Sequence, residues 1–268
     1  MDNQFLVDAE WLARSAGPGV VLIDTRPAAQ FWAGHLQGAR HLDPFPFHYY
    51  DTSAKAIGEF TQQSEWIFSA LGITGSETVV FYEDNSGMRA ARGAWILEYL
   101  GHPAVRILDG GLTALTGAPL TERADPVTPY PFKASVRPEI LATYEQVREA
   151  LGRLSTRIFD VRSEAEYYGE NVRARRGGAI PGAINRDWAL SLDAQGKFKS
   201  PRELRAVFEA LGFSPHDEII AYCQGGYRAA HAYYALRLAG FAKTRNYLGS
   251  WGEWGNREDL PIEKPRRR

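Results

Sequence analysis

Short apolar runs alternate with longer amphipathic stretches along this chain of 268 residues. The runs are rich in Val, Ile and aromatic residues and have the length of buried strands; they lie at 20–23, 79–82, 106–108 and 219–222. Between such runs the pattern predicts helices at 64–71, 89–100, 201–211 and 229–239. In the last of these, apolar residues recur at spacings of three and four, which provides one face for packing. The alternation predicts an α/β fold in which parallel sheets carry helices on both faces.

The pattern occurs twice. An Asp-x-Arg motif follows a strand at 24–26 and again at 160–162, and a Leu-Gly pair precedes a strand at 71–72 and again at 211–212. Repeats this long indicate two copies of one domain and not a solenoid, whose repeats are far shorter. We therefore expect an N-terminal domain over 1–125 and a C-terminal domain over 139–268. Four prolines in the stretch between them, residues 126–138, predict an extended linker.

Composition removes several classes of function. The net charge is −1, so nothing in the charge favours nucleic acid or an anionic membrane as a partner. A single cysteine excludes a disulfide framework within the chain and any Cys-rich metal site, and the six histidines show no helical metal pair. We expect neither a metal nor a cofactor. The chain begins without a basic and apolar leader and has no membrane-length apolar run, so we expect a soluble, cytoplasmic protein.

The single cysteine, Cys223, stands between a predicted strand and a predicted helix, where ligands bind in doubly wound sheets. Gly225 and Gly226 allow positive φ angles and a close approach of backbone N–H groups to an anion. The helix N-terminus and Arg228 add positive charge. Together these features predict a depressed thiol pKa and a nucleophilic thiolate. The alternative is a buried structural cysteine beside a tight turn.

Two chemistries use such a loop of Cys, backbone N–H groups and Arg. One is phosphate monoester hydrolysis, and the other is transfer of a sulfane sulfur through a persulfide. Cysteine phosphatases have five residues between Cys and Arg. This loop has four, namely Gln224, Gly225, Gly226 and Tyr227. The shorter loop favours sulfur transfer, with a phosphatase or arsenate reductase as the alternative.

The chain resembles the rhodanese family, and specifically the tandem-domain thiosulfate sulfurtransferases. Its motifs recur in the order of that family: Asp-x-Arg at 24–26 and 160–162, Gly-Ala at 38–39 and 182–183, the loop 223–228, and Gly-Ser-Trp-Gly-Glu-Trp at 249–254. The resemblance implies that only the C-terminal domain is catalytic. We expect Asp84 to be the N-terminal counterpart of Cys223, and we expect that domain to form a wall of the cleft.

The resemblance also implies roles for individual residues. The Cys223 thiolate takes the outer sulfur of thiosulfate, and a thiol or cyanide removes it. The loop N–H groups of 224–228 stabilise the thiolate and the persulfide, and Arg228 helps to fix the loop and the anion. Asp160 and Arg162 brace the loop, with a surface ion pair as the alternative.

Additional cations and aromatic residues accompany the C-terminal copy. An extra segment carries Arg173, Arg175 and Arg176, which would steer an anionic substrate if they are not merely solvated. Trp251 is expected to support the site and, with Trp254, to pack between the two domains.

Two further alternatives remain. Mercaptopyruvate sulfurtransferases share the architecture, but they carry an arginine where this chain has Glu166, and their loops end without Arg. A non-catalytic binding module is the other alternative, against which an intact Cys223 and Arg228 argue.

Overall fold

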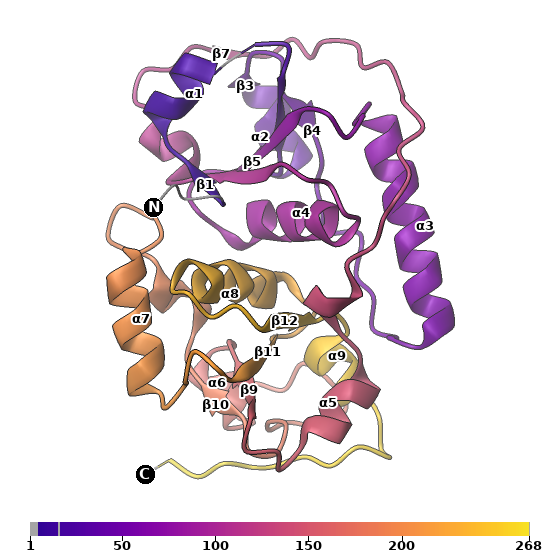
Figure 1. Ribbon diagram of the computed structural model, residues 1–268, viewed down its shortest axis with the longest axis vertical. Helices are drawn as coiled ribbons and strands as arrows, with labels where there is room; N and C mark the ends of the chain where they lie inside the picture. The colour runs from indigo at the N-terminus through magenta and orange to yellow at the C-terminus, as the bar shows by residue number, and fades with distance from the viewer. Residues whose placement is uncertain (1–4, 16, 268) are drawn as a thin grey trace. The chain divides into compact units, whose positions relative to one another are not determined.

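The computed structural model describes residues 5–15 and 17–267, which form two compact units (Figure 1). Unit 1 comprises Met1–Phe47, Gly58–Arg137 and Leu192–Phe198 within the described residues. Unit 2 comprises His48–Ile57, Pro138–Ser191 and Lys199–Arg268. Two short segments therefore belong to a different unit from the residues that flank them in sequence.

Unit 1 is built around a five-stranded parallel sheet with the strand order β1-β6-β5-β2-β4. These strands are β1 (Leu6–Val7), β2 (Val20–Asp24), β4 (Arg40–His41), β5 (Thr78–Tyr82) and β6 (Val105–Leu108). The short strands β3 (His35–Leu36) and β7 (Leu120–Thr121) pair antiparallel beside it. The helical elements are α1 (Ala9–Ser15), α2 (Ala28–Ala33), α3 (Ala54–Ala70), α4 (Met88–Tyr99) and the 3₁₀ turn η1 (Gly111–Ala114). Helix α4 packs on β5 and β6.

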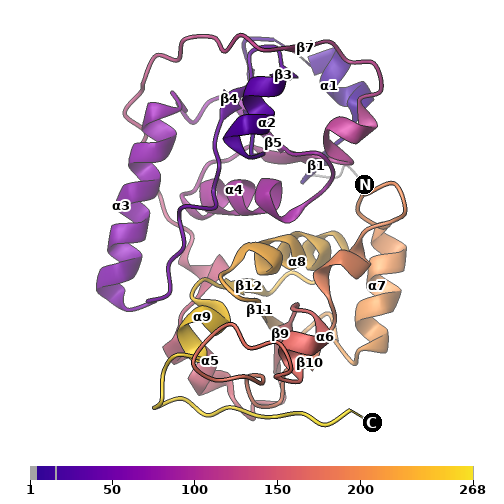
Figure 2. The same ribbon diagram turned by 180° about the vertical axis from the view of Figure 1, so that it is seen from behind.

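Unit 2 repeats this architecture with the strand order β10-β9-β11-β12-β8. Its parallel strands are β8 (Leu141–Ala142), β9 (Thr156–Asp160), β10 (Ile184–Asn185), β11 (Glu218–Tyr222) and β12 (Thr244–Tyr247). The helices are α5 (Tyr144–Ala150), α6 (Glu164–Tyr167), α7 (Pro201–Ala210), α8 (Tyr227–Leu238) and α9 (Ser250–Trp254). The 3₁₀ turns are η2 (Pro138–Ile140) and η3 (Trp188–Ser191). Helices α7 and α8 pack together, and α5 and α9 lie toward the other face (Figure 2).

Matching registers confirm the internal repeat. Asp24 pairs with Tyr82 at the ends of β2 and β5, and Asp160 pairs with Tyr222 at the ends of β9 and β11. In both units the tyrosine hydroxyl accepts a backbone N–H from a residue far earlier in the chain, from Leu36 at 3.2 Å in unit 1 and from Ile180 at 3.1 Å in unit 2. The predicted fold of two parallel, helix-covered sheets is confirmed.

Helix α3 begins ten residues before the predicted helix, at Ala54 instead of residue 64. The added turns contain Gly58 and Thr61, which are poor helix formers, so the local pattern did not indicate them. Ala56 and Phe60 are buried at a spacing of four residues. Tertiary packing therefore stabilises turns that local propensity alone does not favour.

The proline-rich stretch has no helix or strand until η2 begins at Pro138. It is nevertheless fixed to unit 1, because Tyr130 and Arg137 donate backbone hydrogen bonds to the carbonyls of Ser69 and Tyr99. Phe132 is buried. The stretch is extended, as expected, but it packs along unit 1 and is not a free connector.

Candidate active site

Cys223 follows β11 directly, and its side chain is buried within unit 2. The turn to α8 is short because Gly226, the residue before the helix, adopts a left-handed conformation with φ of 81°. Two groups of the α9 region hold the cysteine backbone. Ser250 Oγ accepts the Cys223 N–H at 3.1 Å, and the Trp251 N–H donates to the Cys223 carbonyl at 2.9 Å.

Ser250 holds this contact in an unusual conformation. Its φ is 52°, and it is the only residue other than glycine with positive φ among those the structure describes. Left-handed backbone costs a serine on the order of 1 kcal/mol, and such strain concentrates at functional sites. The Ser250 hydroxyl also donates to the Tyr247 carbonyl at 2.8 Å, which orients its oxygen to accept from Cys223. Sequence reasoning did not identify this residue.

The surroundings of Cys223 favour the thiolate. Burial would raise the thiol pKa, but the positive charge of Arg228 and the backbone N–H groups of Ala229, Gly225 and Gly226 outweigh it, so the pKa is lowered. Two of these N–H groups belong to the loop and one to the first turn of α8. A lower thiol pKa raises the fraction of thiolate, which is the nucleophilic form of cysteine.

Arg228 acts on the sulfur while it is paired with a carboxylate. Its Nη1 and Nη2 donate to Glu166 Oε2 and Oε1 at 2.6 and 2.9 Å, in a bidentate and largely buried ion pair. Burial would raise the pKa of Glu166, but the hydrogen bonds and charge of Arg228, together with Ser163, lower it to about 2. Ser163 and Glu166 form a capping box at the start of α6. Arg228 is therefore held in place by Glu166.

The remaining loop residues are also held in place. Asn246 donates to the Gly226 carbonyl at 3.0 Å from the neighbouring strand β12, a contact that sequence reasoning missed. Gln224 donates from its side chain to the Arg173 carbonyl at 3.1 Å, and its own carbonyl accepts the Gly252 N–H at 2.8 Å. Tyr227 is buried and its ring packs against His48, with 4.7 Å between the ring centroids.

Asp160 and Arg162 form a buried ion pair beneath the loop, so the alternative of a surface ion pair is wrong. Both side chains are at most 1% exposed, and Arg162 Nη2 lies 2.5 Å from Asp160 Oδ2. The Tyr222 hydroxyl donates to the same carboxylate oxygen at 2.5 Å. Arg162 also donates to the Gly178 carbonyl and lies 4.6 Å over the ring of Trp251. Because Tyr222 immediately precedes Cys223, this network fixes the start of the loop.

The three arginines of the extra segment have different environments. Arg173 is half-exposed, and its guanidinium lies 3.6 Å from Glu166, beside the loop. Arg175 is exposed, and its backbone N–H bonds to Asn256. Arg176 donates to the carbonyl of Trp254, the last residue of α9, and to that of Leu260, six residues further along the chain. Arg176 is therefore a helix-end anchor, and of the three only Arg173 lies beside the catalytic loop.

Trp251 and Trp254 are both buried in the hydrophobic core of unit 2. The Trp251 indole N–H donates to the Arg176 carbonyl at 3.1 Å, and the Trp254 indole N–H donates to the Pro261 carbonyl at 2.7 Å. Satisfying these buried donors locks α9 against the core.

Residues 48–52 complete the site in a way that the sequence did not indicate. The Thr52 N–H and hydroxyl donate to the two carboxylate oxygens of Glu253 in α9, at 2.8 and 2.7 Å. The same Glu253 accepts the Tyr247 hydroxyl at 2.8 Å. Preceding Thr52, His48 and Tyr50 lie against the glycines of the loop and of α9. This short segment therefore belongs to unit 2.

Two glycines show how closely the segment approaches. A Cβ on Gly225 would lie 2.8 Å from His48 Cδ2, and a Cβ on Gly252 would lie 2.2 Å from the Tyr50 ring. Neither glycine has a positive φ. Gly225 is thus required by close packing and not by backbone conformation, which corrects the sequence-based reason for it.

Unit 1 has a carboxylate in the place of the sulfur, and it is Glu83, not Asp84. Tyr82 and Tyr222 occupy the same position in the strand registers of the two units, so Glu83, which follows Tyr82, is the structural equivalent of Cys223. Glu83 Oε1 accepts the N–H groups of Arg89 and Ala90, at 2.7 and 3.0 Å, at the start of α4. Asp84 is exposed. The loop between Glu83 and Arg89 is one residue longer than the loop between Cys223 and Arg228. The spacing to the arginine therefore pointed to Asp84 and not to Glu83.

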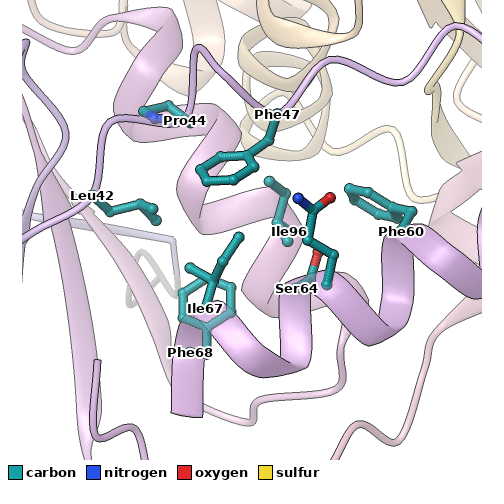
Figure 3. A pocket seen from close by; sticks show the side chains of 9 residues that line it. Leu42, Pro44, Phe47, Phe60, Ser64, Ile67, Phe68 and Ile96 are labelled. Atoms are coloured by element: carbon teal, nitrogen blue, oxygen red, sulfur yellow. The ribbon is translucent and has the colours of Figure 1, made fainter. Parts of the chain in front are cut away.

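Three further features of the described residues bear on other kinds of site. Unit 1 has a small apolar crevice lined by residues of 42–47, α3 and α4, none of them titratable (Figure 3). Within 5–15 and 17–267, no group of three His, Cys, Asp or Glu side chains is arranged to hold a metal ion. Over the same residues, no helix has the length and apolar character that crossing a bilayer requires.

The model of the rhodanese-like domain matches this chain twice, at 8–118 and 143–257. A thiosulfate sulfurtransferase from Azotobacter vinelandii is 34% identical over 95% of both chains, and one from Pseudomonas aeruginosa is 32% identical over 93% of both. A sulfur carrier protein, TtuD of Thermus thermophilus, is 34% identical over 86% of both.

Solved structures share the fold of the whole chain. The anaerobic ergothioneine biosynthesis enzyme from Chlorobium limicola superposes with a TM-score of 0.86 at 24% identity, covering 98% of this chain and 71% of its own. YnjE superposes with a TM-score of 0.85 at 24% identity, covering 98% of this chain and 68% of its own.

Proposed function

The chain belongs to the rhodanese family of sulfurtransferases, and on this premise we propose that it moves a sulfane sulfur from thiosulfate, through a persulfide on Cys223, to a thiol or cyanide acceptor. The observation that carries the proposal is the buried Cys223 sulfur at the start of α8. Its pKa is lowered by Arg228 and by three backbone N–H groups. Thiosulfate as donor is further supported by the names of relatives similar over nearly the full length.

The first half-reaction is a nucleophilic displacement. The Cys223 thiolate attacks the outer sulfur of thiosulfate, a sulfur–sulfur bond forms, and the bond to the sulfonate sulfur breaks. Sulfite leaves with the electron pair, so the negative charge of the thiolate passes to the terminal sulfur of the persulfide. The N–H groups of Gly225, Gly226 and Ala229 face this charge before and after the transfer, which removes the need for solvent to reorganise.

The second half-reaction regenerates the Cys223 thiolate. Cyanide or a thiolate attacks the terminal sulfur, the persulfide bond breaks, and the Cys223 thiolate is released. Since Cys223 is the only cysteine of the chain, no internal thiol is able to discharge the persulfide. The acceptor therefore comes from outside, and a small thiol or a sulfur-accepting protein fits this chemistry.

Intact mass spectrometry tests the proposal. Incubation with thiosulfate should add one sulfur atom to the protein, and cyanide should remove it as thiocyanate. The variant Cys223→Ser should keep the fold and gain no sulfur. A phosphoryl adduct from phosphate monoesters would indicate a phosphatase instead, and no adduct at all would indicate a binding module.

The same assay compares donors. Mercaptopyruvate sulfurtransferases carry an arginine where this chain has Glu166, and an arginine is able to pair with the carboxylate of mercaptopyruvate whereas Glu166 is not. We expect sulfur loading from thiosulfate to be faster than from 3-mercaptopyruvate. The reverse order would assign the chain to mercaptopyruvate.

A further inference from the structure

Tyr50 has one ring face against the catalytic loop and a hydroxyl left available. Its ring lies against Gly252, where a Cβ would come within 2.2 Å, and against Gly225, where a Cβ would come within 3.2 Å. The side chain is nevertheless 45% exposed. Among the residues that the structure describes, none makes a hydrogen bond with the Tyr50 hydroxyl. The ring is therefore fixed while its O–H remains free to donate to a ligand.

The position of the ring is set from both sides. Two residues later, the backbone and side chain of Thr52 are bound to Glu253, and two residues earlier, His48 packs on Tyr227 and lies 5.5 Å from the Tyr50 ring centroid. A donor held on such anchors loses little conformational freedom when it binds a ligand.

The Tyr50 hydroxyl is subject to the charge of a cation and of the proposed nucleophile. The Tyr50 phenol interacts electrostatically with Arg173 and with Cys223. Arg173 is 54% exposed, and its contact with Glu166 is long, at 3.6 Å. By contrast, Arg228 is committed to Glu166 through two short hydrogen bonds. Arg173 is thus the cation beside the loop that has room for an incoming anion.

A dianionic sulfur donor must approach a thiolate of the same sign, and this approach is unfavourable unless the oxyanion end is held by positive charge and donors. We propose that the Tyr50 hydroxyl and the Arg173 guanidinium bind the sulfonate oxygens of the donor, and that they thereby select oxyanion-bearing sulfur donors. Tyr50 donates one hydrogen bond, Arg173 supplies the opposite charge, and the outer sulfur is left facing Cys223. The inference rests on the proposed function, because it names the groups that recognise its donor.

The test uses the full-length protein and two donors, thiosulfate and inorganic polysulfide, the second of which has no oxygen atoms. The variant Tyr50→Phe keeps the ring against the glycines and removes only the hydroxyl. We expect its KM for thiosulfate, relative to its KM for polysulfide, to rise roughly tenfold, the effect of losing one hydrogen bond to a charged group. Arg173→Gln should raise the same ratio. In both variants the rate at which cyanide discharges the preformed persulfide should stay as in the wild type.

Tyr130→Phe is the matched control, because Tyr130 is an exposed tyrosine of unit 1, and it should leave the ratio as in the wild type. An unchanged ratio in Tyr50→Phe would overturn the inference. Equal increases in KM for both donors would also overturn it, since they would show that Tyr50 only shapes the loop. If the wild type takes sulfur from polysulfide but not from thiosulfate, the proposed donor is wrong, which is a separate result.

Discussion

The charged side chains around the Cys223 sulfur are those of Arg228, Glu166 and Arg173. Arg228 lowers the pKa of Cys223 by its charge, and Glu166 holds Arg228 in place by two short hydrogen bonds. The carboxylate also limits how much positive charge the site presents, because the buried pair is close to neutral as a whole. Under the proposed function, recognition of an anionic donor therefore falls to backbone N–H groups and to neighbouring residues such as Arg173.

Replacing Arg228 tests its role at the sulfur. With Arg228→Gln the pKa of Cys223 should rise, because burial is then opposed only by the N–H groups. The thiolate would be lost at a higher pH, so the acid limb of the pH profile for persulfide formation should move to higher pH. The profile is measured by sulfur loading from thiosulfate. Arg202→Gln, at an exposed position on α7, should leave it in place. An unmoved profile in Arg228→Gln would assign the low thiol pKa to the backbone alone.

Glu166 makes a testable contribution to acid stability. Its folded-state pKa of about 2 lies below the ordinary value of 4.5, so its stabilisation is present above pH 4.5 and is lost as the pH falls toward 2. The shift corresponds to about 3 kcal/mol. Urea denaturation should show Glu166→Gln less stable than the wild type at neutral pH, with the difference shrinking in acid. A difference that is constant with pH would contradict this account.

At the level of elements, the site depends on how α9 and the segment 48–52 meet the loop. Helix α9 donates two backbone hydrogen bonds to the loop, from Trp251 and Gly252, and accepts the Cys223 N–H at the Ser250 hydroxyl. The segment 48–52 covers the same helix and is bound to it through Glu253. Loop, helix and segment therefore form one packed layer, in which Gly252 is the closest point.

A pair of glycine substitutions separates packing from helix propensity. Gly252→Ala places a methyl group 2.2 Å from the Tyr50 ring and 2.8 Å from the Gln224 carbonyl oxygen, so we expect a loss of about 1–3 kcal/mol and slower sulfur loading. Gly58→Ala is the matched control. It lies within α3 with no atom near the added methyl group, and it should stabilise the protein by about 1 kcal/mol. Urea denaturation measures both. Equal effects of the two changes would remove the argument for close packing.

At the scale of the whole molecule, the compact units and the sequence repeats are not the same division of the chain. Residues 48–57 belong to unit 2 although they follow strands of unit 1, and 192–198 belong to unit 1 although strands of unit 2 flank them. In unit 1, the Ser86 N–H donates to the Gly196 carbonyl, and the Phe198 N–H donates to Asp109. Each compact unit therefore includes a short segment of the other sequence repeat.

This exchange predicts the behaviour of a truncated chain. A fragment of residues 139–268 keeps Cys223 and its loop but lacks 48–57, so Glu253 would lose both hydrogen bonds from Thr52. We expect lower stability than unit 2 shows in the full chain, and sulfur loading that is slower or absent. Urea denaturation and intact mass give the two readouts. A fragment as stable and as active as the full chain would show that the segment is dispensable.

The two-fold repeat, the parallel sheets, the position of Cys223 and the role of Arg228 as its neighbouring cation were all predictable from the chain. Strand periodicity, the repeated Asp-x-Arg motif and the turn glycines are local signals, so they can be recognised in the sequence without knowledge of the fold. The left-handed glycines after α4 and α8, Gly101 and Gly240, have φ of 89° and 87°, as a helix-terminating glycine requires.

Other features were decided only by tertiary structure, because they join residues far apart in sequence or depend on register. The bidentate Glu166–Arg228 pair, the Ser250 contact to Cys223 and the anchoring of Thr52 on Glu253 span 27 to 201 residues. The counterpart of Cys223 in unit 1 was misassigned to Asp84, because one inserted residue shifts spacing but not strand register. The sequence alone determined which side chain is the candidate nucleophile. The tertiary structure decided which groups surround it, since side-chain contacts across a fold are set by packing and not by order along the chain.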